Sequence, residues 1–331
     1  MFVIGKFIML SEDYTSPEET DPIVVQIPQV CAGLRLDQAL AQLFSEFSRS
    51  RLQRWVREGH VLLNGAAATT KSKVWSGDAV TLQVPEEEGS EDIAPEAISI
   101  EVVYEDDALL VINKPAGLVV HPGNGNRSGT LQNALLHYDS RLGPVPRCGI
   151  VHRLDKDTSG LMVVARTLQA HAELVRQLQA RTVHRHYWAL VQGHIQDDGT
   201  VDAPIGRHPT QRTRMAVVSG GRPAVTHIHV VESLPCHTWI ECRLETGRTH
   251  QIRVHLQHLG FPLAGDPVYG GRGLRLDPRS QSALKSFGRQ ALHAFRLGLV
   301  HPVSGEPVSW EIPMASDMAA LIAVLREARH E

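Results

Sequence analysis

A short charged stretch at residues 148–161, CGIVHRLDKDTSGL, holds the residue types best suited to chemistry. Two carboxylates, Asp155 and Asp157, lie two residues apart, and His152 and Arg153 come just before them. A carboxylate can act as a nucleophile, and a nearby cation keeps it ionised. The alternative is a solvated connection in which Asp157 and the residues after it make the turn. Taken alone the stretch favours that alternative, so the rest of the chain has to decide.

Apolar runs on both sides must position this loop. Residues 149–151 lead into it, and residues 161–165, LMVVA, lead out as a continuous apolar run typical of a buried strand. We expect further strands at 98–104, 108–113, 184–191, 201–218, 224–231, 238–244, 292–299 and 308–312, and helices at 130–138, 167–181 and 247–258. Many strands with few helices between them predict an α+β domain with a mixed or mostly antiparallel sheet.

The composition is that of a globular protein with room for two domains. The chain has 331 residues, of which 42% are hydrophobic and 21% charged. Four cysteines without a CxxC pair indicate a reducing cytoplasm and no structural zinc. Residues 1–10 are apolar, but they are too short to span a bilayer and lack the features of a signal peptide. We therefore expect a cytoplasmic protein without a membrane partner, with Met9 as an alternative start to Met1.

The charge is distributed unevenly along the chain. The net charge is −3, and residues 86–107 contain many acids but no Lys or Arg. Residues 12–21 are also acidic. Arginines are in excess around 49–57, 141–185 and 207–222. Because the acids gather in a tail and a linker, the folded surfaces can be locally basic, which suits a nucleic-acid partner.

The first part of the chain predicts a small unit with a basic helix. We expect strands at 23–27, 61–65 and 79–84, helices at 36–44 and 48–59, and an Asn-Gly turn at 64–65. The second helix carries Arg49, Arg51, Arg54 and Arg57, which would bind RNA, although arginine stripes are more often a solvated helix face. The expected division is a disordered tail at 1–22, an RNA-binding domain at 23–85, an acidic linker at 86–97 and a large domain at 98–331.

Four stretches together resemble, in order and kind, the RluA-type pseudouridine synthases. They are NKPAG at 113–117, HRLDKDTSG at 152–160, RHYWAL at 185–190 and TGRTHQIRVH at 246–255. The match continues through 265–271, 291–294 and 301–302, and the first unit resembles the S4 RNA-binding domain, so that the resemblance covers about residues 30–325. The second and fourth stretches are highly specific, whereas KPAG alone is weak.

The resemblance implies an isomerase that converts specific uridines of large-subunit (23S) ribosomal RNA to pseudouridine. Details at 35–40, 48–51 and 207–210 are similar to the branch of the family that acts on the large ribosomal subunit. The reaction breaks the bond between the base nitrogen and C1′ and rejoins the base through C5, so it needs no cofactor or metal. The implied partner is ribosomal RNA of the large subunit or of its assembly intermediate, and we expect a monomer.

The same resemblance assigns roles to individual residues. Asp155 is implied as the nucleophile, attacking either C1′ or the base, and Arg253 as the arginine that pairs with it. Tyr187 would stack on the uracil and help to move the C5 proton, and Arg153 would fill the space left by the flipped nucleotide. Further expected substrate-binding residues are His152, Lys114 and Arg248, besides Arg49, Arg51, Arg54 and Arg57. Asp157 is the other carboxylate of the loop, and we expect it to have a structural role in the turn.

Other types of site are disfavoured. The chain has 18 histidines, and the pairs 184/186, 227/229 and 255/258 each share a face, but no HExxH or thiolate pair accompanies them. The glycines at 265–273 lack the strand and helix setting of a nucleotide-binding loop. We therefore expect neither a metal nor a nucleotide cofactor.

Two other functions stay open. One is a non-catalytic S4-type RNA-binding protein with a degenerate large domain, against which the intact set of Asp155, Tyr187 and Arg253 argues. The other is a hydrolase that cleaves the glycosidic bond and releases uracil. An assay that separates free uracil from an isomerised nucleotide distinguishes the hydrolase from the isomerase.

The basic helix of the small unit can be tested directly. Reversing two of Arg49, Arg51, Arg54 and Arg57 to Glu is expected to weaken RNA binding and to flatten its dependence on salt, because each phosphate contact releases counterions. The measurement is the RNA dissociation constant over a series of salt concentrations. An unchanged slope would mean that this helix face is only solvated.

Overall fold

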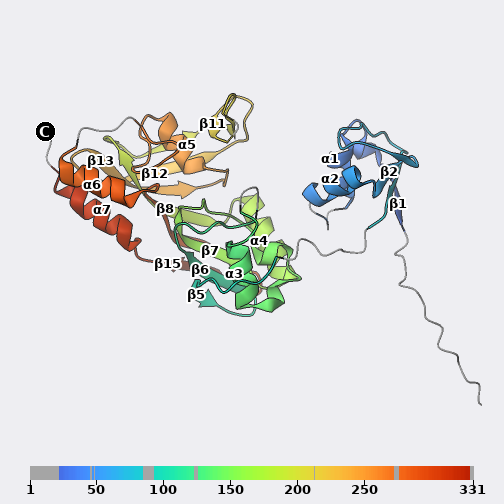
Figure 1. The fold of residues 1–331 in the computed structure, drawn as a ribbon, viewed down its shortest axis with the longest axis horizontal. Helices are drawn as coiled ribbons and strands as arrows, with labels where there is room; N and C mark the ends of the chain where they lie inside the picture. The colour runs from blue at the N-terminus through green and yellow to red at the C-terminus, as the bar shows by residue number, and fades with distance from the viewer. Residues whose placement is uncertain are drawn as a thin grey trace, which may run out of the picture. The chain divides into compact units, whose positions relative to one another are not determined.

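The computed structural model describes residues 22–44, 47, 49–84, 93–122, 126–211, 213–271 and 276–328, apart from the side chains of 50 and 51. The chain divides into two compact units, Met1–Asp92 and Ile93–Glu331, and each is described by itself (Figure 1). The expected disordered tail, except its last residue, and residues 86–92 of the expected linker lie outside the described residues.

The small unit contains the predicted pair of helices and an antiparallel sheet. The strand order is β1 (Ile23–Gln26), β4 (Ala79–Leu82), β2 (Val61–Leu63), β3 (Ala66–Ala67), and the helices are α1 (Leu36–Leu43) and α2 (Arg49–Glu58). Asn64 and Gly65 both have positive φ, 53° and 76°, which is the backbone that a two-residue hairpin between β2 and β3 requires. The Asn-Gly turn is therefore confirmed.

A buried carboxylate joins the two helices of the small unit. Asp37, in the first turn of α1, is fully buried and accepts hydrogen bonds from Arg49 at 2.7 Å and from Gln53 at 2.6 Å. Arg49 therefore holds α2 against α1. Arg54 lies 3.8 Å from Glu58 and Arg57 donates to the Gln53 carbonyl, and both are exposed. RNA binding by these arginines stays a prediction, and the side chain of Arg51 lies outside the described residues.

The large unit is built on one mixed sheet of nine strands, which confirms the predicted α+β class. Its order is β5 (Glu101–Glu105), β6 (Leu109–Lys114), β7 (Ser159–Ala165), β14 (Leu292–Val300), β8 (His184–Gln192), β13 (His237–Leu244), β12 (Val225–Ser233) and β9 (Gly199–Asp202), and β15 (Pro307–Glu311) also pairs with β14. β7 and β14 are parallel, and the other pairs are antiparallel.

The segment expected as one strand at 201–218 is instead broken. β9 ends at Asp202, and a separate two-stranded sheet follows, formed by β10 (Ile205–Arg207) and β11 (Met215–Val217). Pro204 lies at the break, and a proline cannot donate a hydrogen bond to a neighbouring strand. This small sheet carries the chain away from β9 before β12 returns to it.

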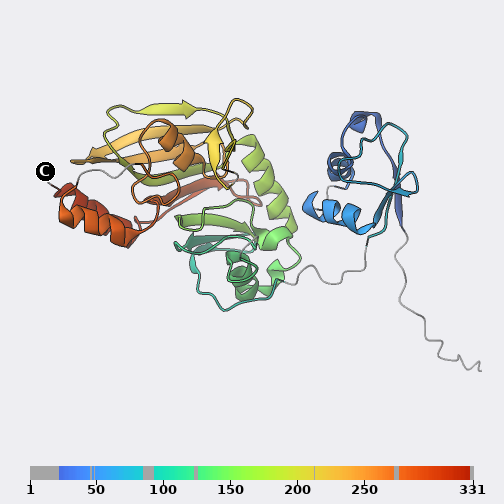
Figure 2. The same ribbon diagram turned by 45° about the horizontal axis from the view of Figure 1, so that its top comes forward.

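Helices cover the sheet through alternating strand residues. The helices are α3 (Leu131–Tyr138), α4 (Leu168–Ala180), α5 (Gln251–His258), α6 (Pro278–Phe287) and α7 (Ser316–Arg326). On β8, Tyr187 and Ala189 belong to the core shared with α3 and α5, whereas Leu190 packs in the cluster of α6 and α7, which lie side by side (Figure 2). Within the described part of the chain, no helix is long and apolar enough to cross a membrane.

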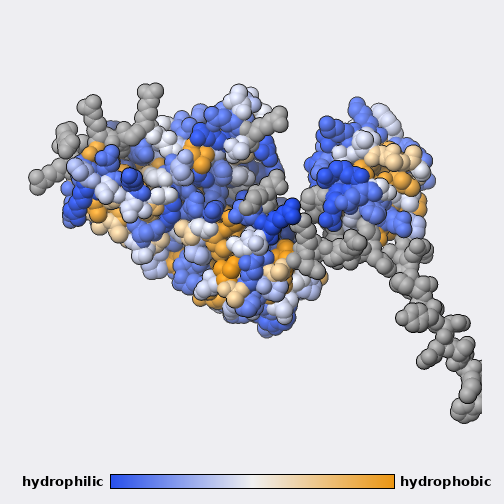
Figure 3. Space-filling view, in the orientation of Figure 1, coloured by the Kyte–Doolittle hydropathy of each residue, from blue (hydrophilic) through white to orange (hydrophobic). Residues whose placement is uncertain are grey.

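Hydrophilic residues cover most of the large unit's visible face, and hydrophobic ones gather over the part that carries β6 and α3 (Figure 3). The large unit also includes residues 93–97, which were expected to belong to the linker. The Asn133 amide donates to the Ala94 carbonyl at 2.9 Å, and Glu96 accepts from the Gly129 N–H at 2.9 Å. These contacts to α3 and the residue before its cap tie the segment to the large unit.

The charged loop at 152–158 lies directly before β7, near the point where β14 changes its neighbour from β7 to β15. β14 pairs with β7 only through residues 293 and 294, and it continues beside β15 from residue 296. Gly160 makes this approach possible. Its φ is +115°, and a Cβ at this position would lie 2.2 Å from the Ala294 carbonyl oxygen. The glycine of the DTSG stretch therefore sets how closely β7, and with it the loop, approaches β14.

Gly160→Ala tests this close approach. We expect a loss of stability above about 2 kcal/mol, because the new Cβ overlaps backbone and the φ is unfavourable for alanine. Thermal unfolding measures the effect. The control is Gly199→Ala in β9, where an added Cβ meets nothing within 4 Å. Equal melting temperatures for the two variants would contradict the role assigned to Gly160.

Candidate active site

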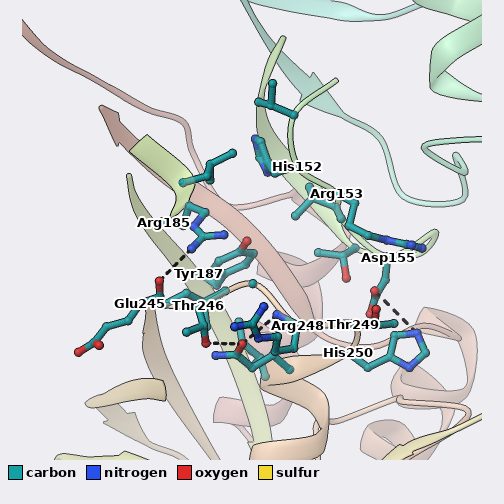
Figure 4. Close-up of a pocket in the computed structure, with 18 of the residues that line it drawn as sticks. His152, Arg153, Asp155, Arg185, Tyr187, Glu245, Thr246, Arg248, Thr249 and His250 are labelled. Carbon is teal, nitrogen blue, oxygen red and sulfur yellow. Dashed lines mark hydrogen bonds and ion pairs between the residues drawn. The ribbon is translucent and has the colours of Figure 1, made fainter. Parts of the chain in front are cut away.

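A cavity of about 610 Å³ lies against the charged loop and brings distant parts of the sequence together. Asp155 comes from the loop before β7, Tyr187 from β8 and Arg253 from α5, and all three line the cavity. Figure 4 shows Asp155 and Tyr187 at its wall. Arg153 and Arg248, both expected to bind substrate, line it as well. The sequence-predicted residues of the large unit thus converge on one cavity, with the exception of Lys114.

The ion pair expected between Asp155 and Arg253 is present. Arg253 Nη1 donates to Asp155 Oδ2 at 2.8 Å, and the two side chains are 5% and 15% exposed, respectively. Burial opposes the charge on Arg253, but its hydrogen bonds to Asp266 and the charge of Asp155 more than offset this and raise its pKa. The guanidinium therefore stays charged and holds the carboxylate in one orientation.

Asp266 anchors this arginine from behind. Its oxygens accept from Arg253 Nε at 2.8 Å and Nη2 at 2.9 Å, and Oδ1 also accepts from the backbone N–H groups of Val268 and Tyr269. Burial alone would raise the pKa of Asp266, but these donors lower it below its ordinary value. No role was expected for Asp266 from the sequence, although it lies in the matching stretch at 265–271, which was the available signal.

His250 lies next to this array. Its Nε2 is 3.8 Å from Asp155 Oδ1, and its Nδ1 is 2.8 Å from the hydroxyl of Tyr269. Burial lowers the pKa of His250, although the charge of Asp155 opposes this shift. His250 also has a φ of +57°, which is unusual for a residue with a side chain. The start of α5 is thus strained where it approaches Asp155.

Tyr187 contributes a buried ring to the cavity. It is 5% exposed, and in the sheet it lies between Cys242 of β13 and Ala294 of β14. Burial raises the pKa of its hydroxyl, so the phenol stays protonated at neutral pH. The ring therefore offers an uncharged surface on which a planar base can stack.

His152 and Arg153 follow one another in the chain but have different surroundings. His152 lines the cavity, and its Nε2 accepts from the Val163 N–H at 3.1 Å, which ties the loop to β7. Burial, and then the charge of Arg185, lower its pKa to about 3, so the ring is neutral. Arg153 is exposed and can reach a ligand at the cavity mouth.

Lys114 lies beneath the loop and is not among the described residues that line this cavity. Its ammonium is fully buried and donates to three carbonyl oxygens, those of Pro115, Leu118 and Lys156, at 2.7 to 2.9 Å. Burial lowers its pKa to about 7, although the charges of Asp157 and Asp155 oppose this shift. The geometry gives Lys114 the role of joining the KPAG segment to the loop, in place of the expected contact with substrate.

The other end of the loop is held by Arg289. Its Nη1 donates to the Asp157 carbonyl at 3.1 Å, and its Nε lies 2.7 Å from Asp317. The Thr158 N–H donates to the Asp155 carbonyl at 3.1 Å and closes the turn. The backbone of Asp157 is therefore part of the turn, as expected, and Asp155 is the carboxylate directed at Arg253.

Two parts of the chain match known families. Residues 108–258 match the family described as RNA pseudouridylate synthase, and residues 34–80 match the S4 domain. A similar protein is the ribosomal large subunit pseudouridine synthase D of Nitrosomonas europaea, 55% identical over 95% of this chain and 91% of the relative. The protein of the same name from Escherichia coli K12 is 52% identical over 89% of this chain and 91% of the relative.

Solved structures agree with these matches. The human RNA pseudouridylate synthase domain containing 4 superposes with a TM-score of 0.55 at 26% identity, over 70% of this chain and 94% of that one. The human RNA pseudouridylate synthase domain containing 1 gives a TM-score of 0.51 at 28% identity, over 73% of this chain and 98% of that one.

Asp266→Asn tests the anchor of Arg253. We expect a loss of about 3–5 kcal/mol at pH 7, because a buried guanidinium loses half of its compensating charge. Since the pKa of Asp266 is lowered on folding, its contribution is complete above its unfolded pKa, near 3.8, and disappears as the pH falls through the lower folded value. The difference in melting temperature between wild type and variant should therefore shrink below about pH 4.

Asp198→Asn is the matched control, because Asp198 accepts from His229 on the surface. It should leave the melting temperature nearly unchanged. A difference between wild type and Asp266→Asn that stays constant from pH 7 to pH 3 would show that the Asp266 charge has no part in holding Arg253.

Proposed function

The chain belongs to the RNA pseudouridylate synthase family, and we propose that it isomerises specific uridines of large-subunit ribosomal RNA, with Asp155 as the nucleophile. The protein is an RNA pseudouridine synthase, and the names of its relatives support the large-subunit RNA as substrate. The observation that carries the proposal is the Asp155 carboxylate, held 2.8 Å from the guanidinium of Arg253 inside a cavity that Tyr187 also lines.

The proposed reaction balances within the nucleotide itself. The bond between N1 of uracil and C1′ breaks, the base turns, and a bond forms between C5 and C1′. The C5 proton leaves and N1 gains a proton, so no oxidant, reductant or transferred group is required. The carboxylate of Asp155 bonds to one fragment during this exchange and is released at the end, which divides a difficult step into two easier ones. We propose on this basis that the enzyme works without a cofactor.

The surroundings of Asp155 suit a nucleophile better than a proton carrier. Arg253 pairs with the carboxylate and orients it, and the neighbouring His250 has a pKa lowered by burial and is neutral at pH 7. Because the Tyr187 phenol stays protonated, we assign its ring to stacking on the uracil rather than to acting as a base. The exposed Arg153 at the cavity mouth is suited to replace a flipped uridine in the RNA helix.

The small unit supports RNA as the ligand. Its match to the S4 domain spans residues 34–80, which include the whole of α2. The guanidinium groups of Arg54, near Glu58, and of Arg57 are exposed, so phosphates can reach them, whereas the exposed Arg49 shares its charge with the buried Asp37. We assign this unit to positioning the RNA, since contacts to phosphate fix orientation without reading sequence.

Asp155→Asn tests the nucleophile. Asparagine has nearly the same shape but lacks the charge and the nucleophilic oxygen, so the variant should fold, bind the RNA at similar or slightly higher affinity, and form no detectable pseudouridine. Excess enzyme should not restore product, because the covalent route itself is removed. The assay is release of tritium from C5-labelled uridine, with product analysis that separates pseudouridine from free uracil.

Asp157→Asn is the matched control within the same loop. Its backbone carbonyl, which accepts from Arg289, is unchanged by the substitution, so substantial activity and a modest loss of stability are expected. Turnover by Asp155→Asn together with an inactive Asp157→Asn would reverse the assignment. Free uracil as the wild-type product would replace isomerisation with hydrolysis.

A further inference from the structure

Arg185 is a buried cation without a counter-ion among the described residues. It is 7% exposed, its Nε is buried with no hydrogen-bond partner, and its Nη2 is 3.4 Å from the Glu245 carbonyl oxygen. The two other buried arginines of the described chain are compensated: Arg253 binds Asp155 and Asp266, and Arg289 binds a carboxylate of α7. An uncompensated buried charge costs several kcal/mol. A buried guanidinium that lacks a counter-ion in the protein therefore indicates a binding site for an anionic ligand.

Six further arginines line the same cavity as Arg185, and three of them form a group with it: Arg181, Arg222 and Arg248. Burial, and then the charges of Arg222, Arg181 and Arg185, lower the pKa of Arg248, so these three guanidinium groups lie close enough to act on it. The carboxylate of Glu245 is 3.9 Å from Arg181, and it also lies 2.7 Å from His227. One shared carboxylate leaves the group strongly positive.

The backbone around Arg185 leaves room for its guanidinium. A Cβ on Gly247 would lie 2.6 Å from Arg185 Nη1, so any side chain at this position would displace the guanidinium. Gly247 directly precedes Arg248, whose Nε donates to the Pro223 carbonyl at 3.0 Å. The Thr-Gly-Arg segment thus places two guanidinium groups at one wall of the cavity. Figure 4 shows Arg185 on one side of Tyr187 and Asp155 on the other.

We propose that Arg185, together with Arg181, Arg222 and Arg248, binds one backbone phosphate of the RNA next to the target uridine. This inference rests on the proposed function. The base would lie between Tyr187 and Asp155, and the phosphate would supply the counter-ion that Arg185 lacks. The planar fork of a guanidinium group matches phosphate oxygens in two-point contact, and the water-poor wall strengthens each contact.

The experiment combines Arg185→Met with a series of altered RNAs. Methionine keeps much of the side-chain length and removes the charge. The RNA is a hairpin that the wild type modifies, and in each member of the series one phosphate near the target is a neutral methylphosphonate. For the wild type, we expect one position at which the neutral linkage weakens binding about tenfold or more, equivalent to about 1.4 kcal/mol. Arg185→Met should bind the unaltered RNA more weakly by a similar factor.

The decisive measurement combines the two changes, the Arg185→Met substitution in the protein and the methylphosphonate in the RNA. In Arg185→Met the penalty at that one position should disappear, whereas in Arg279→Met it should remain, because Arg279 is exposed on α6 and pairs with Glu327. Arg185→Met should also melt at the same or a higher temperature, since it removes an uncompensated charge. Equal penalties in wild type and Arg185→Met at every position would overturn the proposal.

Failure of the variant to fold and failure of the proposed function are distinguished from failure of the phosphate site as follows. If Arg185→Met does not fold, the half-exposed Arg248→Met must remove the same penalty, and its failure to do so would also overturn the proposal. If the wild type forms no pseudouridine in any large-subunit ribosomal RNA hairpin, the proposed substrate is wrong. If it forms pseudouridine but shows no position-specific penalty, only the phosphate site is wrong.

Discussion

The buried guanidinium of Arg253 holds the carboxylate of Asp155, the proposed nucleophile, in place, and it can do so because a second carboxylate supports it. Asp155 and Asp266 share this one cation, with three contacts between 2.8 and 2.9 Å. The three residues come from the loop before β7, from α5 and from the segment after α5. Loss of one partner in such a group leaves a buried charge uncompensated, at a cost of about 3–5 kcal/mol. The position of Asp155 and the contact between the loop before β7, α5 and the segment after α5 therefore depend on the same pairing of Arg253 with two carboxylates.

The two ends of the cavity differ in how their cations are compensated. At one end, Asp155 and Asp266 compensate Arg253. At the other end, Arg185 and the arginines near it leave an excess of positive charge. A nucleotide is matched to this division, because its base is neutral and its phosphate is an anion. The arrangement would hold the glycosidic bond at the carboxylate and keep the phosphate away from it, which avoids repulsion between two anions.

The sequence predicted the parts of the site that local patterns encode. The loop at 152–158, the strand after it and the mixed sheet follow from apolar runs and charged residues, and the pairing of Asp155 with Arg253 followed from the resemblance. The role of Lys114 could not be read in this way, because its three acceptors include a carbonyl 42 residues away, which only the folded chain brings close. The missing counter-ion of Arg185 is likewise a property of packing, not of sequence.

Other features of the structure were not predicted, although the sequence contains the patterns that indicate them. The helix α7 has buried residues at 318, 321, 322 and 325, the spacing of an amphipathic helix, and α6 begins with Asp277 as its cap followed by Pro278. Both helices could have been predicted. Asp266 lies in a stretch that matched the family, yet its function as an anchor requires knowing that Arg253 turns inward with both carboxylates in reach.

The central claim is that Asp266 acts on the chemistry only through Arg253. Single-turnover rates of pseudouridine formation in a double-mutant cycle of Arg253→Lys and Asp266→Asn test it most directly. The account predicts that each single variant lowers the rate by about 10-fold or more with little change in RNA affinity, and that the double variant is no slower than the slower single variant. Effects that multiply, or an Asp266→Asn variant with the wild-type rate, would contradict it.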